Sequence, residues 1–237
     1  MAGGPLRFVV ASADSKGTPD GAAKAFQTVV QTSGAQVVVG PLATSEVLGA
    51  KQFADENKIT IIALLPAACP ARFRMTTSSG RCSRPTFSNR KAFSGLSAAR
   101  GYENIVVLHL DDPFGNGFTE AFTEQFQAAG GKEVAAIKYA PEPSDLTSEV
   151  TKVSSEIARL SDAGTTAFLC VCFLGDAQKV LQQAVVDPVM GTVDWMGAEN
   201  LRTPDILADV DQAVSAPGEV YLGLLGQYHQ PQHPALY

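Results

Sequence analysis

The amino-acid sequence predicts an α/β fold in which parallel sheets are covered by helices. Short apolar runs alternate with amphipathic stretches along most of the 237 residues. The runs at residues 59–64 and 104–110 are nearly continuous in Val, Ile and Leu, as is typical of parallel strands buried on both faces. Strand and helix alternating at this spacing indicate βαβ units with right-handed crossovers. Two such series, separated by a stretch of different composition, predict two lobes, each with its own parallel sheet.

The first series is expected to contain three strands and two helices. The strands are predicted at residues 6–11, 36–40 and 59–64, and the second helix at residues 45–57. The first helix has recognisable ends. Thr18 can cap it, Pro19 suits its first position and Asp20 lies in its first turn, whereas Gly34 can end it.

The second series repeats the same alternation over a longer stretch of the chain. Its strands are predicted at residues 104–110, 133–139, 166–173 and 193–196, and its helices at residues 116–129, 144–160 and 176–186. Gly130 and Gly131 close the first of these helices.

Net charge argues against a nucleic-acid partner or an anionic membrane surface. The chain carries 18 Lys and Arg against 24 Asp and Glu, a formal net charge of −6, with a pI near 5.1. An acidic balance gives no electrostatic footprint for phosphate backbones. No apolar run is long enough to span a bilayer, and residues 1–7 have no signal-peptide pattern. We therefore expect either a cytoplasmic chain or one without its targeting segment.

A basic segment between the two series departs from the pattern. Residues 66–98 contain no Asp or Glu. The basic residues between positions 66 and 100 are Arg72, Arg74, Arg81, Arg84, Arg90, Lys91 and Arg100. Three interpretations stay open: a solvated basic loop, a phosphate or nucleic-acid patch, and a local shift of reading frame. We expect residues 66–98 to be an aberrant linker without a well-packed helix or strand, because unpartnered charges resist burial.

Cysteine usage gives little support for metal or redox chemistry. Cys170 and Cys172 alternate within an apolar run, so they point to the same face of a strand and suit a buried core as small hydrophobes. A disulfide between Cys69 and Cys82 stays open. No C-x-x-C pattern occurs and no His lies near a Cys, so a zinc site is not expected.

Enzyme motifs are absent from the sequence. There is no G-x-S-x-G, no H-E-x-x-H and no P-loop pattern. His109 lies within a predicted strand and is expected to be a hydrogen-bonded core residue. Asp111 and Asp112 follow that strand and could hold Mg²⁺, whereas residues 12–17 make a poor nucleotide-binding turn. We expect no enzyme, no cofactor and no metal. A Mg²⁺- or nucleotide-dependent α/β enzyme is the alternative.

Three segments resemble the type I periplasmic solute-binding proteins of ABC transporters, in particular the branched-chain (Leu/Ile/Val) amino-acid binding type. They are QVVVGPLATS at 36–45 with NKITII at 57–62, then ARGYENIVVL at 99–108 with DDPFGNG at 111–117 and residues 122–131, and lastly DWMGAEN at 194–200. Their order and spacing carry the resemblance, which covers about two-thirds of the chain.

The resemblance implies two lobes that close on a solute at their interface. Their expected extents are residues 1–65 for a partial first lobe, 66–98 for the linker, 99–200 for the second lobe and 201–237 for a partial return segment. It also implies a monomer outside the cytoplasm that delivers an amino acid or similar small polar solute to a membrane permease. A receptor ectodomain of the same fold is an alternative.

The resemblance further implies a member truncated at both ends. The family's first strand and helix, which precede the equivalent of residues 6–11, are missing here, and the family continues beyond the equivalent of Tyr237. Together with the basic segment, this predicts an uncovered sheet edge in the first lobe and poor solute binding.

The candidate ligand-binding residues lie where strands end. Leu42, Ala43, Thr44 and Ser45 link a strand to a helix, where free N–H groups and the helix dipole suit an anion. Alternatively, Thr44 or Ser45 caps its own helix. The resemblance assigns Glu199 to the ammonium group of the solute. A solvated loop acid is the alternative.

Further candidates rest on the resemblance. It places Asp112 and Phe114 at the matching strand end of the second lobe, and Phe173, which could equally be core, at the next one. Ala67, Ala68 and Cys69 fall where the family has a small-small-Thr loop, so Cys69 replaces a hydroxyl.

Overall fold

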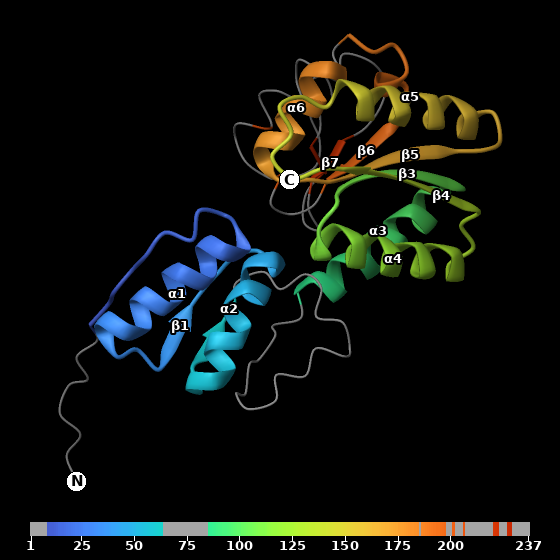
Figure 1. The fold of residues 1–237 in the computed structure, drawn as a ribbon. Coiled ribbons are helices and arrows are strands. Elements are labelled where there is room, and N and C mark those ends of the chain that lie inside the picture. The colour runs from blue at the N-terminus through green and yellow to red at the C-terminus, as the bar shows by residue number, and fades with distance from the viewer. Residues whose placement is uncertain are drawn as a thin grey trace. The chain divides into compact units, whose positions relative to one another are not determined.

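The fold comprises two compact units, Met1–Pro85 and Thr86–Tyr237, each with its own sheet (Figure 1). The computed structural model describes residues 9–63, 85–184, 186–197, 201, 206, 220–222 and 227–228. Both sheets consist of parallel strands accompanied by helices, as predicted, apart from one antiparallel pair at the end of the second sheet. Within the described ranges, no helix is both long and apolar enough to cross a membrane.

From residue 19 onward, the first unit follows the predicted element order. It contains α1 (Pro19–Ser33), β1 (Val37–Val39), α2 (Thr44–Asn57) and β2 (Thr60–Ile62). The predicted ends of α1 are confirmed: Thr18 Oγ1 accepts a hydrogen bond from the Gly21 N–H at 3.1 Å, and Gly34 ends the helix in the left-handed region at φ 68°. A residue with a Cβ would be strained at Gly34.

Helices α1 and α2 pack closely against one another in this unit. A Cβ on Gly49 of α2 would lie 2.3 Å from the carbonyl oxygen of Pro19, so the glycine permits this close approach. The core contains Phe26 from α1 together with apolar residues of α2 and β2. Val37, Val39 and Ile62 stay exposed, because no described element covers their face of the sheet.

The predicted strand at residues 6–11 is wrong where the structure describes it. Residues 9–15 are irregular, and Val9 and Val10 are 85% and 89% exposed. Residues 6–8 lie outside the described ranges. Strand propensity alone does not make a strand, because an isolated segment has no ladder partner to satisfy its backbone.

The second unit has a six-stranded sheet in the order β4-β3-β5-β6-β7-β8. Its strands are β3 (Asn104–Leu110), β4 (Glu133–Tyr139), β5 (Thr166–Val171), β6 (Asp194–Gly197), β7 (Val220–Leu222) and β8 (Gln227–Tyr228). Neighbouring strands are parallel except for the β7–β8 pair. The predicted strands at 104–110 and 133–139 match β3 and β4.

Two separate cores cover the faces of this sheet. The helices are α3 (Pro85–Arg100), α4 (Pro113–Ala128), α5 (Thr147–Ser161) and α6 (Leu174–Ala184), with a 3₁₀ turn at Met190–Thr192. Alternate residues of β3 enter different cores: Val106 and Leu108 pack with α5 and α6, whereas Ile105 and Val107 pack with α3 and α4. This double burial is the reason for the continuous apolar run in the sequence.

Helix α3 corrects the expectation that residues 66–98 lack packed structure. It begins at Pro85, and Phe93 and Ser97 are buried in the second unit at 2% and 0% exposure. Phe93 and Leu96 lie three positions apart and form an apolar face that packs against the core. This packing stabilises the helix although the segment has no acidic residue to pair with its basic ones. Residues 64–84 lie outside the described ranges.

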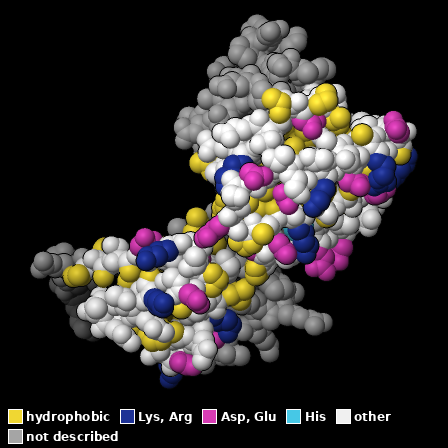
Figure 2. Space-filling model, turned by 45° about the horizontal axis from the view of Figure 1, so that its top comes forward, with side chains coloured by type: hydrophobic (Ala, Val, Ile, Leu, Met, Phe, Trp, Pro, Cys, Tyr) yellow, Lys and Arg dark blue, Asp and Glu magenta, His cyan; other side chains and the backbone are white. Residues whose placement is uncertain are grey.

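Charged side chains of both signs are interspersed on the face shown in Figure 2. On the second unit, for example, Arg159 pairs with Glu133 at 2.5 Å and Lys138 with Asp111 at 3.3 Å. These exposed pairs contribute little to stability.

Candidate functional site

The first candidate site follows β1, where the chain enters α2. Its N-cap residue is Ala43, which has no side-chain acceptor. Glu46 fills that role from within the helix: its Oε2 accepts from the Ala43 N–H at 2.8 Å, and its Oε1 accepts from the Ser15 hydroxyl at 2.6 Å. The alternative that Thr44 or Ser45 caps the helix is therefore wrong, because the helix begins at Thr44.

Hydrogen-bond donors stay available in the first turn of α2. The first helical bond runs from the Val47 N–H to the Ala43 carbonyl at 3.0 Å, so the N–H groups of Thr44 and Ser45 precede it. No described residue accepts from either of them. The Thr44 hydroxyl is also buried without a partner among the described residues. This turn can therefore bind an acceptor oxygen, beside an exposed Leu42.

The buried Glu46 carboxylate changes the electrostatics of this turn. Glu46 is 3% exposed and lies at the positive end of the helix dipole. It offsets part of the charge that would attract an anion. A ligand oxygen that binds to Thr44 and Ser45 gains hydrogen bonds, but a full negative charge on it is repelled by Glu46.

The second candidate site lies at the carboxyl edge of the six-stranded sheet. Strand β3 is followed by α4, which belongs to one core, and β5 is followed by α6, which belongs to the other. The connections therefore diverge at the β3–β5 pair, which makes it a topological switch point. Ligands of open parallel sheets bind outside the strand ends at such points.

Asp112 follows β3 and caps α4. Its Oδ1 accepts from the Gly115 N–H at 2.7 Å, and the residue is 8% exposed. Burial raises the pKa of this carboxyl, opposed by the N–H groups of Gly115 and Phe114. Helix α4 thus starts at Pro113, earlier than the predicted 116, because Asp112 and Pro113 form its cap and first turn.

Asp111 is exposed and already engaged. Its Oδ1 accepts from Asn116 at 2.9 Å and from Lys138 at 3.3 Å, and these bonds hold its pKa below the ordinary value. In the described part of the chain, no group of three or more His, Cys, Asp or Glu side chains could hold a metal ion.

His109 is the core histidine that the sequence predicts. It is 1% exposed on β3, with Nδ1 at 3.0 Å from the Leu110 carbonyl oxygen. Burial lowers its pKa. A Cβ on Gly115 would lie 2.1 Å from the Leu110 carbonyl oxygen and 3.0 Å from His109 Nδ1, so glycine is required at the start of α4.

The two candidate phenylalanines differ in their surroundings. Phe114 packs against Phe118 with ring centroids 6.0 Å apart, and so belongs in part to the core. Phe173 follows β5 and is 40% exposed, so its ring is available to a ligand.

Tyr139 is a residue of this edge that the sequence analysis missed. It ends β4 and is 1% exposed, and its hydroxyl donates to Asp176 Oδ2 at 3.1 Å. The Phe173 backbone also hydrogen-bonds to this hydroxyl, and burial raises the Tyr139 pKa. Lys179 ties the same helix to the Pro143 carbonyl oxygen at 2.6 Å. Tyr139 thus holds the start of α6 beside Phe173. The feature of the sequence that could have identified it is a tyrosine hydroxyl at the end of a predicted strand.

A disulfide joins Cys170 to Cys172 at the end of β5. Their Cα atoms lie 5.5 Å apart and both residues are buried, as predicted. The bond itself was not predicted, because burial as small hydrophobes already accounts for two cysteines on one face of a strand. Cys69 and Cys82, the pair that sequence left open, lie outside the described residues.

The described residues do not bring all candidates together. Ala67, Ala68, Cys69 and Glu199 lie outside the described ranges. Leu42–Ser45 belong to the first unit, and Asp112, Phe114 and Phe173 to the second.

Comparison with known proteins gives consistent results. The periplasmic binding protein family matches residues 1–185. An uncharacterised protein of Methanocaldococcus jannaschii is 24% identical over 206 residues, which is 83% of this chain and 48% of the relative.

Several solved structures share the fold. An extracellular ligand-binding receptor from Rhodopseudomonas palustris HaA2 has a TM-score of 0.70 at 17% identity, covering 88% of this chain and 55% of that one. A solute-binding protein of an R. palustris ABC transporter in complex with benzoate has a TM-score of 0.67 at 16% identity, with 88% and 55% covered.

A leucine-binding protein from Thermotoga maritima has a TM-score of 0.66 at 16% identity, with 85% and 55% covered. The chain thus spans about half the length of these relatives. The match over most of its length, together with the fold of both units, shows that the chain belongs to the periplasmic binding protein family, whose members bind solutes and are not enzymes.

Proposed function

We propose that this chain provides solute-binding surfaces of an extracytoplasmic ABC-transporter component, and that its solute is an amino acid or similar small molecule with a carboxylate. The observation that carries the proposal is the first turn of α2, where the N–H groups of Thr44 and Ser45 and the buried Thr44 hydroxyl have no described partner. Together they form a donor cluster for one oxygen-bearing end of a solute.

The structural relatives support a carboxylate. Their ligands include benzoate, 4-hydroxybenzoate and 3,4-dihydroxybenzoic acid, and one relative is a leucine-binding protein. Each of these molecules carries a carboxyl group. The carboxylate would accept from Thr44 and Ser45, at some cost from Glu46.

The second unit offers a candidate surface of its own. The exposed Phe173 offers an apolar surface at the β3–β5 switch point. Glu199 remains our candidate for the ammonium group of an amino acid, and Ala67, Ala68 and Cys69 for the remaining wall. A membrane permease remains the proposed partner, with this chain acting as a monomer.

The test is a thermal-unfolding series with leucine, glutamate, benzoate and 4-hydroxybenzoate at about 10 mM, because a ligand that binds the native state raises its melting temperature. We expect a carboxylate-bearing solute to raise it, and benzyl alcohol, which lacks the carboxylate, to have no effect. Thr44→Val should reduce the shift, whereas Thr28→Val, at an exposed position of α1, should leave it unchanged. The assignment would be refuted if no carboxylate raised the melting temperature. Equal shifts in the Thr44→Val and Thr28→Val variants would refute it as well.

A further inference from the structure

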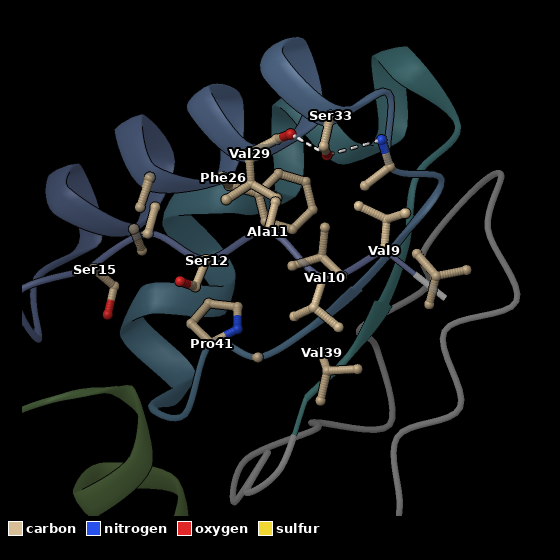
Figure 3. A pocket seen from close by; sticks show the side chains of 17 residues that line it. Val9, Val10, Ala11, Ser12, Ser15, Phe26, Val29, Ser33, Val39 and Pro41 are labelled. Atoms are coloured by element: carbon tan, nitrogen blue, oxygen red, sulfur yellow. Dashed lines mark hydrogen bonds between the residues drawn. The ribbon is translucent and has the colours of Figure 1, made fainter. Parts of the chain in front are cut away.

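A disulfide joins two alternate residues at the point where β5 ends and α6 begins. Cys170 lies on β5, whereas Cys172 follows the last strand residue, Val171, and belongs to no helix or strand. These are the only cysteines among the described residues, and the pocket of the first unit in Figure 3 is lined by apolar residues and serines. Thiol chemistry within the described part of the chain is therefore confined to this strand end.

The strand ends early at the disulfide. The Cα atoms of Cys170 and Cys172 lie 5.5 Å apart, whereas two residues of a parallel strand advance about 6.6 Å. The ladder between β3 and β5 ends with the pair of His109 and Val171. Leu110, one position farther along β3, still pairs with β4 but, among the described residues, not with β5. The disulfide thus marks the place where β5 stops while β3 continues.

Phe173 follows the disulfide directly and leads into α6. Its carbonyl accepts from the Asp176 N–H at 3.1 Å and from the Ala177 N–H at 2.9 Å. Its ring is 40% exposed. A shift of Cys172 is therefore transmitted through one peptide bond to the residue that holds the first turn of α6 and presents an aromatic ring at the surface.

The surroundings suit both oxidation states of the cysteine pair. The sulfur of Cys172 lies 3.8 Å from the Leu108 carbonyl oxygen, so a free thiol there would have an acceptor for its S–H group. A free Cys170 thiol would stay among the apolar side chains of its core, which suit a small hydrophobe. Breaking the bond therefore need not disrupt the core.

We propose that the disulfide between Cys170 and Cys172 is a redox-sensitive switch in the β5–α6 connection, and that a dithiol reductant opens it. A thiolate of the reductant attacks the Cys172 sulfur, because this residue lies beyond the last ladder pair, where a strand end opens locally at low cost. The S–S bond breaks, and Cys170 leaves as a thiolate and takes up a proton. The second thiolate of the reductant then attacks the mixed disulfide. Cys172 leaves and is protonated in turn, and the reductant is oxidised to its own disulfide.

Reduction lets the chain extend at this point. Cys170 and Cys172 then separate by about 1 Å, to the ordinary advance of a strand, which moves Cys172 toward the position opposite Leu110. Phe173 moves with it, and the hydrogen bonds that hold the first turn of α6 to its carbonyl are weakened. The oxidised form thus fixes Phe173, and the reduced form releases it. This switch goes beyond the proposed function and does not depend on which solute binds.

Residue-resolved hydrogen exchange of the native chain in both oxidation states tests the proposal. The reductant is dithiothreitol at about 10 mM, and alkylation followed by mass spectrometry of residues 160–179 reports the redox state. After reduction, we expect the Asp176 and Ala177 amides to exchange at least about tenfold faster, since weakly held amides lose protection. Asn116 is the matched control, because its amide bonds to the Asp112 carbonyl at 3.0 Å at the start of α4, and it should not change. Reoxidation should restore slow exchange.

A pair of variants separates the bond from the packing around it. Replacing both cysteines, Cys170→Ala with Cys172→Ala, keeps small apolar side chains but removes the bond. The Asp176 and Ala177 amides should then exchange as in the reduced chain, with no response to dithiothreitol. Val106→Ala removes packing from the same core but keeps the bond, so it should respond to dithiothreitol as the parent chain does.

The comparison of the parent chain in its two oxidation states needs no substitution, so it decides the proposal even if the double variant does not fold. The proposal is overturned if the bond does not form, or if dithiothreitol reduces it only in denaturant. It is also overturned if reduction leaves exchange in the first turn of α6 unchanged, or if Asn116 is affected to the same extent. A double alanine variant that still responds to dithiothreitol would likewise overturn it.

Discussion

The Glu46 carboxylate accepts a hydrogen bond from the backbone N–H of Ala43, three residues before it, at 2.8 Å. This bond lets a helix begin without a side-chain acceptor at its N-cap. It also puts a buried carboxylate next to the turn that we propose for a ligand carboxylate. The charge of Glu46 therefore stabilises the helix but lowers the affinity for a carboxylate solute.

Glu46→Gln tests the two effects of this charge, on stability and on solute affinity. The amide keeps an acceptor oxygen but loses the charge, so we expect a loss of about 0.5–1 kcal/mol from the weaker helix-dipole interaction. Affinity for a carboxylate ligand should rise several-fold, because repulsion from Glu46 disappears. Chemical unfolding and calorimetry with benzoate measure the two effects. Glu56→Gln, at an exposed position near the end of α2, is the control and should change neither. Weaker benzoate binding in Glu46→Gln would contradict this account.

Tyr139→Phe removes one hydroxyl from the carboxyl edge of the second sheet. Asp176 loses its 3.1 Å hydrogen bond, which should cost about 1 kcal/mol, because the carboxylate is only partly buried and keeps its ion pair with Lys179 at 3.5 Å. Ligand affinity should fall as well, since the start of α6 beside Phe173 is loosened.

Tyr102→Phe is the matched control for Tyr139→Phe. The Tyr102 hydroxyl bonds to Asp194 at the opposite end of the strands. Its loss should lower the melting temperature without changing ligand affinity. If both variants change affinity equally, Tyr139 has no positioning role.

His109 should make the free energy of unfolding depend on pH. Burial lowers its pKa from the ordinary 6.5, so the unfolded chain binds the proton more readily than the folded chain. This contribution to stability is present above pH 6.5 and is lost as pH falls below it. Unfolding in urea between pH 7.5 and 5.5 should show the decline, and His109→Gln should flatten it.

The disulfide between Cys170 and Cys172 can be detected in one peptide. Trypsin cleaves after Arg159 and Lys179, which releases residues 160–179 with both cysteines. After oxidative refolding, this peptide should be two hydrogen atoms lighter than its reduced form and should resist alkylation until a thiol reductant is added. Cys170→Ser provides the free-thiol control. Double alkylation of the refolded protein in denaturant without reductant would show that the bond does not form.

The sequence by itself determined the alternation of strands and helices. Residues 104–110 are a strand as predicted, because this continuous apolar run is buried from both faces. Residues 133–139 are also a strand as predicted, at the edge of the sheet, where Ile137 and Tyr139 are buried. The ends of α1 were also predicted from the sequence, because Thr18 and Gly34 each bond to backbone groups of the helical turn next to them. The family resemblance rested on such local segments and was confirmed.

Only the tertiary structure decided which of the local signals were used. Val9 and Val10 have strand propensity, but they form no strand because no described segment pairs with them. Helix α3 forms in the basic segment that was predicted to lack packed structure, because Phe93 packs into a hydrophobic core of the second unit. Tyr139 bonds to Asp176 across 37 positions, and Ser15 bonds to Glu46 across 31. Such partners are set by strand order and by helix packing, which a linear pattern does not contain.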